Sequence, residues 1–257
     1  MRVKDKIIVV TGATKGIGRG IALRLALEGA KVIVSGRDER NGMATVNQII
    51  ANQGDALFVY ADMSRPEDCH RLIETCVSNF GRVDGLVNNA GIFPHIDLMN
   101  TDEQTLDTVL KTNVSGPFFC IQAAIPHMRA QRSGSIVNIG STHWEMGSKE
   151  LAAYACSKGA LHTLTQHVAA HYAEDKIRCN WITVGWVLSE GEIRRHYKDG
   201  HDDAWIAQLA QRFIPFGEYQ TAEDIAEACL FLLSDESRQI TATDIKVTGG
   251  FEPRRNT

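Results

Sequence analysis

The stretch YACSK places Tyr154 and Lys158 four residues apart among small side chains. At helical pitch the two positions lie one above the other on the same face, so the phenol hydroxyl and the ammonium group reach one small volume. A cation beside a phenol favours the phenolate and lowers a pKa that is ordinarily about 10. The pair could transfer a proton near neutral pH, although so short a pattern also occurs by chance on exposed helices.

Three glycines, Gly12, Gly16 and Gly18, stand in the stretch TGATKGIG, directly after the apolar run KIIVV. A strand that turns into a helix through glycines lets backbone N–H groups and the helix dipole approach a pyrophosphate, because a Cβ would block that approach. The spacing is G-x-x-x-G-x-G rather than G-x-G-x-x-G. Glycine turns also occur without ligands, but between a strand and a helix this one predicts cofactor binding.

Short β-branched runs alternate with helical patterns along the first part of the chain: KIIVVTG, KVIVSGR, ALFVYAD and DGLVNNAG are separated by helices that begin near Ile17 and Glu39 and by a third helix. This alternation predicts an α/β fold of Rossmann type, a doubly wound parallel sheet of about seven strands with helices on both faces. Asp62-Met63 and the stretch NNAG, Asn88 to Gly91, end two predicted strands, where such sheets bind ligands.

Further helices are expected in the rest of the chain. Ser64 and Glu67 predict a capping box at the start of the third helix. A long helical stretch is predicted from Thr101 to Met128, and another helix from about Leu151 to Ala173. The stretch TAEDIAEACLFLLS predicts a capped helix and DIKVTGG a last strand.

Residues 188–216 are charged and interrupted by glycine, and only the piece DDAWIAQLAQRF is amphipathic. A long irregular excursion inside a compact domain is usually a lid or a binding loop. With no repeat and no low-complexity linker, residues 1–257 are expected to form one dinucleotide-binding and catalytic domain with a substrate lid at about 188–216.

Composition excludes several classes of protein. The 257 residues are 44% hydrophobic and 23% charged, as in soluble globular chains, and no apolar run approaches the length of a membrane span. A net charge of -4 supplies no basic field for nucleic acid. The opening MRVKDKIIVVTG leads into glycines rather than a cleavage site, so we expect a cytoplasmic protein with no membrane partner.

Neither cysteines nor histidines indicate a metal centre. The six cysteines include no C-x-x-C pair and are expected to be reduced, packed thiols. His167 and His171 have the spacing of a metal-binding pair, and His196 and His201 lie in another polar stretch. No third ligand matches the first pair, so no metal is predicted.

Taken in order, TGATKGIG, Asp62-Met63, NNAG, Asn113 in KTNVSG, Ser141 and the Tyr154-x-x-x-Lys158 pair resemble the short-chain dehydrogenase/reductase family from Lys6 to about Gly250. The chain departs from that family in the stretch VGWVLS. Val184 replaces a proline, which restores an N–H and loosens φ at the hinge of the lid. Ser189 replaces a threonine and keeps a hydroxyl for the cofactor. Thr248 replaces the aspartate of the final Asp-Gly-Gly in many relatives.

The resemblance implies hydride transfer between a nicotinamide and a carbonyl or secondary alcohol. In that scheme Tyr154 is the acid or base, and Lys158 tunes it and binds the nicotinamide ribose. Ser141 would hold the substrate oxygen, and Asn113 would position a water that relays protons. The alternative is a catalytically silent relative that uses the dinucleotide as a sensor or acts as an assembly partner, but the presence of all four residues favours an enzyme.

The cofactor is expected to be NADP(H) rather than NAD(H). Gly36 stands where a strand that selects NAD ends in an acid, and Arg37 and Lys15 supply cations for a 2′-phosphate. Asp38 and Glu39 could cancel those cations. The residues expected to contact the cofactor are Gly12, Thr14, Lys15, Gly16, Ile17, Gly18, Arg37, Asp62, Met63, Asn89, Ala90, Gly91, Tyr154, Lys158, Val187 and Ser189.

The substrate is a small carbonyl or alcohol whose identity the sequence leaves open. Its expected contacts are His95, His143, Trp144 and Trp186. The tryptophans could form an apolar wall, whereas His143 and the charges of the lid favour a polar substrate such as a sugar or polyol. Charges on a surface loop are also explained by solvation alone, so a 3-oxoacyl thioester, a steroid and a xenobiotic ketone remain open. The long helices carry apolar residues on more than one face, and relatives pair such helices, so a homotetramer is predicted.

Overall fold

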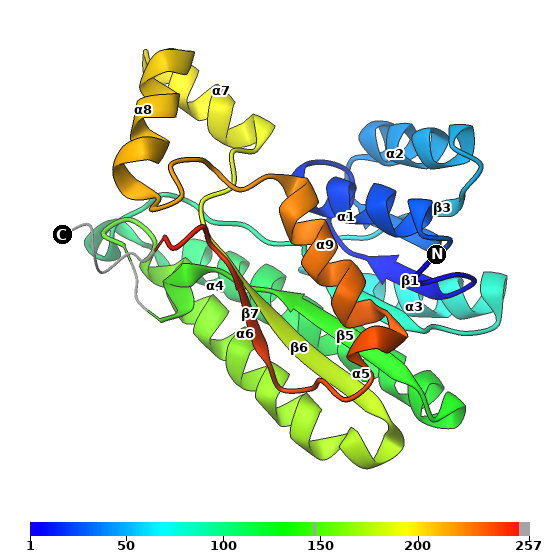
Figure 1. The fold of residues 1–257 in the computed structure, drawn as a ribbon. Coiled ribbons are helices and arrows are strands. Elements are labelled where there is room, and N and C mark those ends of the chain that lie inside the picture. The colour runs from blue at the N-terminus through cyan, green and yellow to red at the C-terminus, as the bar shows by residue number, and fades with distance from the viewer. Residues whose placement is uncertain (146–147, 252–257) are drawn as a thin grey trace.

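The centre of the computed structural model, which describes residues 1–145 and 148–251, is a seven-stranded parallel sheet (Figure 1). Its strand order is β3-β2-β1-β4-β5-β6-β7, so the direction of winding reverses between β1 and β4. This confirms the predicted doubly wound sheet. The strands are β1 (Ile7–Val10), β2 (Lys31–Gly36), β3 (Asp55–Tyr60), β4 (Gly85–Asn88), β5 (Gly134–Ile139), β6 (Ile177–Val184) and β7 (Asp244–Val247).

Helices cover both faces of the sheet (Figure 1). Strand β1 shows why: alternate residues point to opposite faces, with Ile8 and Val10 in one buried cluster and Ile7 and Val9 in the other. The first cluster packs under α1 (Gly16–Leu27), α2 (Glu39–Ala51) and α9 (Ala222–Leu233). The second packs under α3 (Pro66–Phe80), α5 (Gly116–Gln131) and α6 (Ala152–His171).

The long helical stretch predicted from Thr101 to Met128 is confirmed, because the backbone is helical from Glu103 to Gln131, but it is not regular throughout. Two α-helices, α4 (Glu103–Leu110) and α5, are joined by a π-helical turn at Lys111–Ser115. Pro117 explains the change, because its ring has no N–H and would collide with the carbonyl group four residues earlier in a regular helix. The wider turn carries Asn113 to the interior.

The capping box predicted at Ser64 and Glu67 is wrong. Helix α3 begins after Arg65, which makes no side-chain capping bond. The Ser64 hydroxyl instead donates to Asp62 Oδ1 at 2.8 Å, beyond the end of β3. The capped helix predicted near the C-terminus is confirmed, because Thr221 and Asp224 form a capping box at the start of α9.

Most of residues 188–216 is helical rather than irregular. Helix α7 (Glu190–Lys198) begins where the Ser189 hydroxyl accepts from the N–H of Glu192, and α8 (Asp203–Phe213) begins in the same way at Asp202. Figure 1 shows both helices standing away from the layers of the sheet. Helix α7 was not predicted because its residues are mostly polar and exposed, and the prediction relied on the periodicity of apolar residues.

All six cysteines are free, and five are buried as expected, whereas Cys156 is exposed on α6. No helix in the described part of the chain is long and apolar enough to cross a membrane.

Candidate active site

A cavity of about 1580 Å³ opens at the carboxyl ends of the central strands. Most of the predicted site residues line it: Gly12, Thr14, Lys15, Gly16, Ile17, Gly18, Arg37, Asp62, Met63, Asn89, Ala90, Gly91, His95, Ser141, His143, Tyr154, Lys158, Trp186, Val187 and Ser189. The structure therefore gathers residues from both halves of the chain around one space. Asn113 and Trp144 are not part of its lining.

The glycine turn between β1 and α1 has the shape of an anion cradle. Gly12 and Gly16 have φ of +64° and +55°, in the left-handed region that favours glycine. A Cβ on Gly18 would overlap the carbonyl group of Gly12. Helix α1 starts with no side-chain cap and no acidic residue in its first turn, so its N–H groups and its dipole face the cavity. These features fit the pyrophosphate of a dinucleotide.

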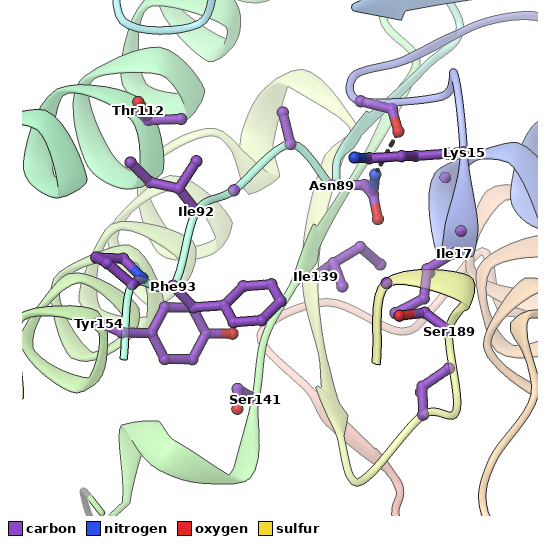
Figure 2. A pocket seen from close by; sticks show the side chains of 18 of the residues that line it. Lys15, Ile17, Asn89, Ile92, Phe93, Thr112, Ile139, Ser141, Tyr154 and Ser189 are labelled. Atoms are coloured by element: carbon purple, nitrogen blue, oxygen red, sulfur yellow. Dashed lines mark hydrogen bonds between the residues drawn. The ribbon is translucent and has the colours of Figure 1, made fainter. Parts of the chain in front are cut away.

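The stretch NNAG braces this turn from β4. The Thr11 hydroxyl accepts from the backbone N–H groups of Asn89 and Ala90 at 3.0 and 3.1 Å. In return, the Asn89 side chain donates to the carbonyl groups of Thr11 and Gly12 at 2.9 and 3.2 Å (Figure 2). The two neighbouring strand ends are thus joined by hydrogen bonds that fix the floor of the cavity.

The end of β2 presents a cation to the cavity. Arg37 is 64% exposed, and its guanidinium lies 3.6 Å from the Asp62 carboxylate. Asp38 caps α2, where its carboxylate accepts from the backbone N–H of Asn41 at 3.0 Å, a bond that lowers its pKa. A Cβ on Gly36 would lie 2.7 Å from Thr14 Cγ2, so an acidic residue there would require Thr14 to move.

Tyr154 and Lys158 lie on one face of α6, as their spacing predicts. The Lys158 ammonium group is 5.6 Å from the centre of the Tyr154 ring and donates to the carbonyl group of Ile139 at 2.7 Å. Burial raises the pKa of Tyr154 to about 12, although a hydrogen bond with Ser141 acts in the opposite direction. Burial also lowers the pKa of Lys158 to about 8. The expected lowering of the Tyr154 pKa is therefore absent in the protein alone, because desolvation of the phenolate dominates.

Aromatic side chains surround the Tyr154 ring. Phe93 contacts it edge to face, with ring centres 5.8 Å apart, and His143 approaches at 6.1 Å. Figure 2 shows the Phe93 ring beside the Tyr154 ring. Sequence reasoning missed Phe93, whose only signal was its position two residues after NNAG. It also missed other lining residues, including Ile92, Pro94, Glu150, Leu151 and Phe251.

Asn113 acts behind the cavity wall. Its amide group donates to the Ile92 carbonyl group at 2.8 Å and to the Ser157 hydroxyl at 3.0 Å, and its oxygen accepts from the N–H of Ile92 at 2.9 Å. The side chain thus joins the segment after β4 to α6. The predicted water relay through Asn113 stays a prediction.

The structure separates the two tryptophans that were expected to contact substrate. Trp144 stacks on His162 at 3.9 Å and donates to the Thr183 hydroxyl at 3.3 Å, outside the lining of the cavity. Trp186 does line the cavity, and its indole N–H donates to Glu192 at 3.1 Å. The sequence did not reveal that His162, on the next helix, provides a stacking surface for Trp144.

A small network holds the cavity side of α7. The Glu192 carboxylate is 13% exposed and pairs with Arg195 at 2.5 Å. Burial acts to raise the pKa of Glu192, but hydrogen bonds from Arg195 and Trp186 outweigh it and keep the pKa below its usual value. His95 and Glu150 also line the cavity, and His95 lies 3.4 Å from the Glu150 carboxylate. This end of the cavity combines aromatic surface with paired charges.

The histidine pair on α6 shows no further ligands. The rings of His167 and His171 stack with centres 5.5 Å apart. Across residues 1–145 and 148–251, no group of three or more His, Cys, Asp or Glu side chains is placed to hold a metal ion.

Comparison with known proteins gives consistent results. The family model described as enoyl-(acyl carrier protein) reductase matches residues 12–252. An uncharacterized oxidoreductase of Thermotoga maritima is 34% identical over 250 residues, which cover 97% of this chain and 98% of the relative. A 3-oxoacyl-[acyl-carrier-protein] reductase of Staphylococcus aureus is 37% identical over 246 residues, covering 95% and 97%. The crystal structure of levodione reductase superposes with a TM-score of 0.91 at 29% identity, covering 97% and 98% of the two chains.

Proposed function

The chain belongs to the short-chain dehydrogenase/reductase family and is an oxidoreductase that acts between a carbonyl group and an alcohol, and we propose that it uses NADP(H) with Tyr154 as the acid or base. The observation that carries this proposal is the convergence of Ser141, Tyr154 and Lys158 with the glycine turn around one cavity. A dinucleotide held at the turn would extend along this cavity towards the phenol.

Tyr154, Ser141 and Lys158 have separate roles in carbonyl reduction. When bound, the nicotinamide supplies hydride to the carbonyl carbon, or accepts it in the reverse direction. The Tyr154 hydroxyl donates a proton to the developing alkoxide, and its raised pKa keeps it protonated at neutral pH. Ser141 hydrogen-bonds the same oxygen, and Lys158 holds the ribose and favours the phenolate that remains.

Preference for NADP(H) follows from the charges at the end of β2. Arg37 lines the cavity and is largely exposed, so its guanidinium is accessible to a 2′-phosphate. Lys15 lines the same cavity from the glycine turn. Gly36 supplies no carboxylate, and the carboxylate of Asp38 is engaged at the start of α2. Arg37 and Lys15 therefore support the binding of a 2′-phosphate, which would compete with the Asp62 carboxylate for the Arg37 guanidinium.

We also propose a lid over the cavity and a homotetrameric assembly. Residues 188–216 act as the lid of one domain, because Glu192, Arg194 and Arg195 of α7 border the cavity. The cytoplasmic protein forms a homotetramer, which is supported by apolar side chains that α4 and α5 leave at the surface: Leu106 is 40% and Phe118 is 44% exposed. A monomer mass by light scattering at micromolar concentration would contradict the tetramer.

The test of the proposed function is a substrate panel read from the absorbance of the reduced nicotinamide. The panel contains sugars, 3-oxoacyl thioesters, steroid ketones and small diketones, together with the corresponding alcohols. We expect turnover of at least one class with NADPH. If the protein binds the dinucleotide and converts none of these classes, the catalytically silent alternative holds.

A further inference from the structure

The side-chain oxygen of Ser141 is hydrogen-bonded to a histidine two residues further along the chain. The Ser141 Oγ lies 3.2 Å from Nδ1 of His143, and the backbone N–H of His143 donates to the same oxygen at 3.3 Å. Ser141 is only 7% exposed, and the Tyr154 side chain lies beside it. His143 lines the cavity, so the histidine and the serine meet substrate from the same wall.

The hydroxyl of Ser141 has one proton to donate, and Nδ1 of a neutral histidine is either a donor or an acceptor. When Nδ1 accepts, the Ser141 proton is directed at His143, and the serine offers substrate only a lone pair. When Nδ1 carries the proton, His143 donates to Oγ and the Ser141 proton is free to turn to substrate. A carbonyl oxygen can only accept, whereas an alcohol can also donate.

We propose that His143 is a positioning residue that sets the direction of the hydrogen bond between Ser141 and the substrate oxygen. With the proton on Nδ1 the serine is oriented to hold a carbonyl group, and with the proton on Nε2 it is oriented to hold an alcohol. This inference rests on the proposed function. It adds a residue to that site which neither the glycine turn nor the tyrosine-lysine pair implies.

The surroundings of His143 keep both tautomers available. The groups that face it are Ser141 after β5, Tyr154 on α6 and His95 from the segment after β4, and His95 is itself beside Glu150. Burial and the neighbouring His95 lower the pKa of His143. The ring is therefore neutral at neutral pH, and a neutral ring exchanges its proton between the two nitrogens.

The kinetic test uses two substitutions at one position. In His143→Phe the ring is kept and both nitrogens are removed, so kcat for carbonyl reduction should fall roughly tenfold, the effect of one hydrogen bond, with the KM for NADPH unchanged. In His143→Asn an amide N–H can take the place of Nδ1, so most of the activity should return. A His143→Asn enzyme as impaired as His143→Phe would overturn the inference.

A double-mutant cycle shows whether His143 acts through Ser141. In the Ser141→Ala background the His143→Phe change should cost nothing further in kcat, because the hydroxyl that it orients is gone. An equal loss in both backgrounds would mean that His143 acts independently of the serine, and the inference would fail.

Nitrogen NMR of the histidine rings provides a readout that does not depend on turnover. The resonance of His143 Nδ1 should shift in Ser141→Ala, because its hydrogen-bond partner is removed. An unchanged resonance overturns the inference even in an active enzyme. Absence of turnover by the wild type on the whole panel instead counts against the proposed function, and the NMR measurement still decides whether the Ser141–His143 bond exists.

Discussion

The floor of the cavity and its lid are built in different ways. At the floor, the turn after β1 is held by backbone groups and by Thr11 and Asn89, so its shape depends on strand ends that the sheet fixes. In the lid, α7 is held by side-chain contacts such as Trp186–Glu192 and Glu192–Arg195. Side chains of the lid can therefore change without disturbing the sheet, whereas the shape of the floor depends on the strand ends.

The largest effect should come from adding one methyl group to the floor. In Gly18→Ala the new Cβ would overlap the Gly12 carbonyl group, and backbone cannot move aside cheaply. We expect dinucleotide affinity to fall about a hundredfold and the free energy of unfolding to drop by about 1–3 kcal/mol. Fluorescence titration and urea unfolding measure the two quantities.

Gly159→Ala is the matched control for that change. Gly159 lies on α6, and a Cβ there would meet no atom within 4 Å. This variant should bind the dinucleotide normally and gain about 0.5–1 kcal/mol of stability, because alanine is the better helix former. Normal binding by Gly18→Ala would show that the floor is less rigid than its contacts indicate.

A smaller effect is expected from Arg37, which lines the cavity at the end of β2. Arg37→Ala should lower kcat/KM with NADPH roughly tenfold and leave the value with NADH nearly unchanged, because one partly screened charge-assisted contact is lost. Arg40→Ala removes the same charge from an exposed residue outside the lining and serves as control. An equal loss with both cofactors, or a wild type that prefers NADH, would contradict the assigned cofactor.

The smallest effect should come from the lid. Glu192→Gln removes the charge that holds Arg195 but keeps a similar shape, so the KM for substrate should rise about threefold while cofactor binding is unchanged. Because the folded pKa of Glu192 is lowered, its contribution to stability is present above its unfolded pKa and is lost as the pH falls through the folded value. The variant should therefore lose less stability than the wild type on acidification.

A pH series of urea unfolding measures that difference. Glu74→Gln, on α3, changes an exposed glutamate outside the lining of the cavity and should alter neither quantity measurably. An unchanged substrate KM in Glu192→Gln would show that α7 does not position substrate.

The sequence predicted the parts of the site that depend on neighbours along the chain. The glycine turn and the Tyr154–Lys158 pair are local patterns, and the sheet follows from alternating segments. The π-helical turn before α5 was missed because the effect of Pro117 was not weighed against the helical pattern around it. The place of Trp144 outside the cavity lining and that of Phe93 within it could not be predicted, because their partners His162 and Tyr154 come from a distant segment. The raised pKa of Tyr154 depends on packing that no spacing rule describes.

The central claim is that the Tyr154 hydroxyl transfers the proton. The most direct measurement is kcat of Tyr154→Phe on the best carbonyl substrate, beside its affinity for NADPH. We predict that kcat falls by at least about a hundredfold while NADPH binding stays close to that of the wild type. A variant that keeps more than about a tenth of the wild-type kcat would contradict the assignment of Tyr154 as the acid or base.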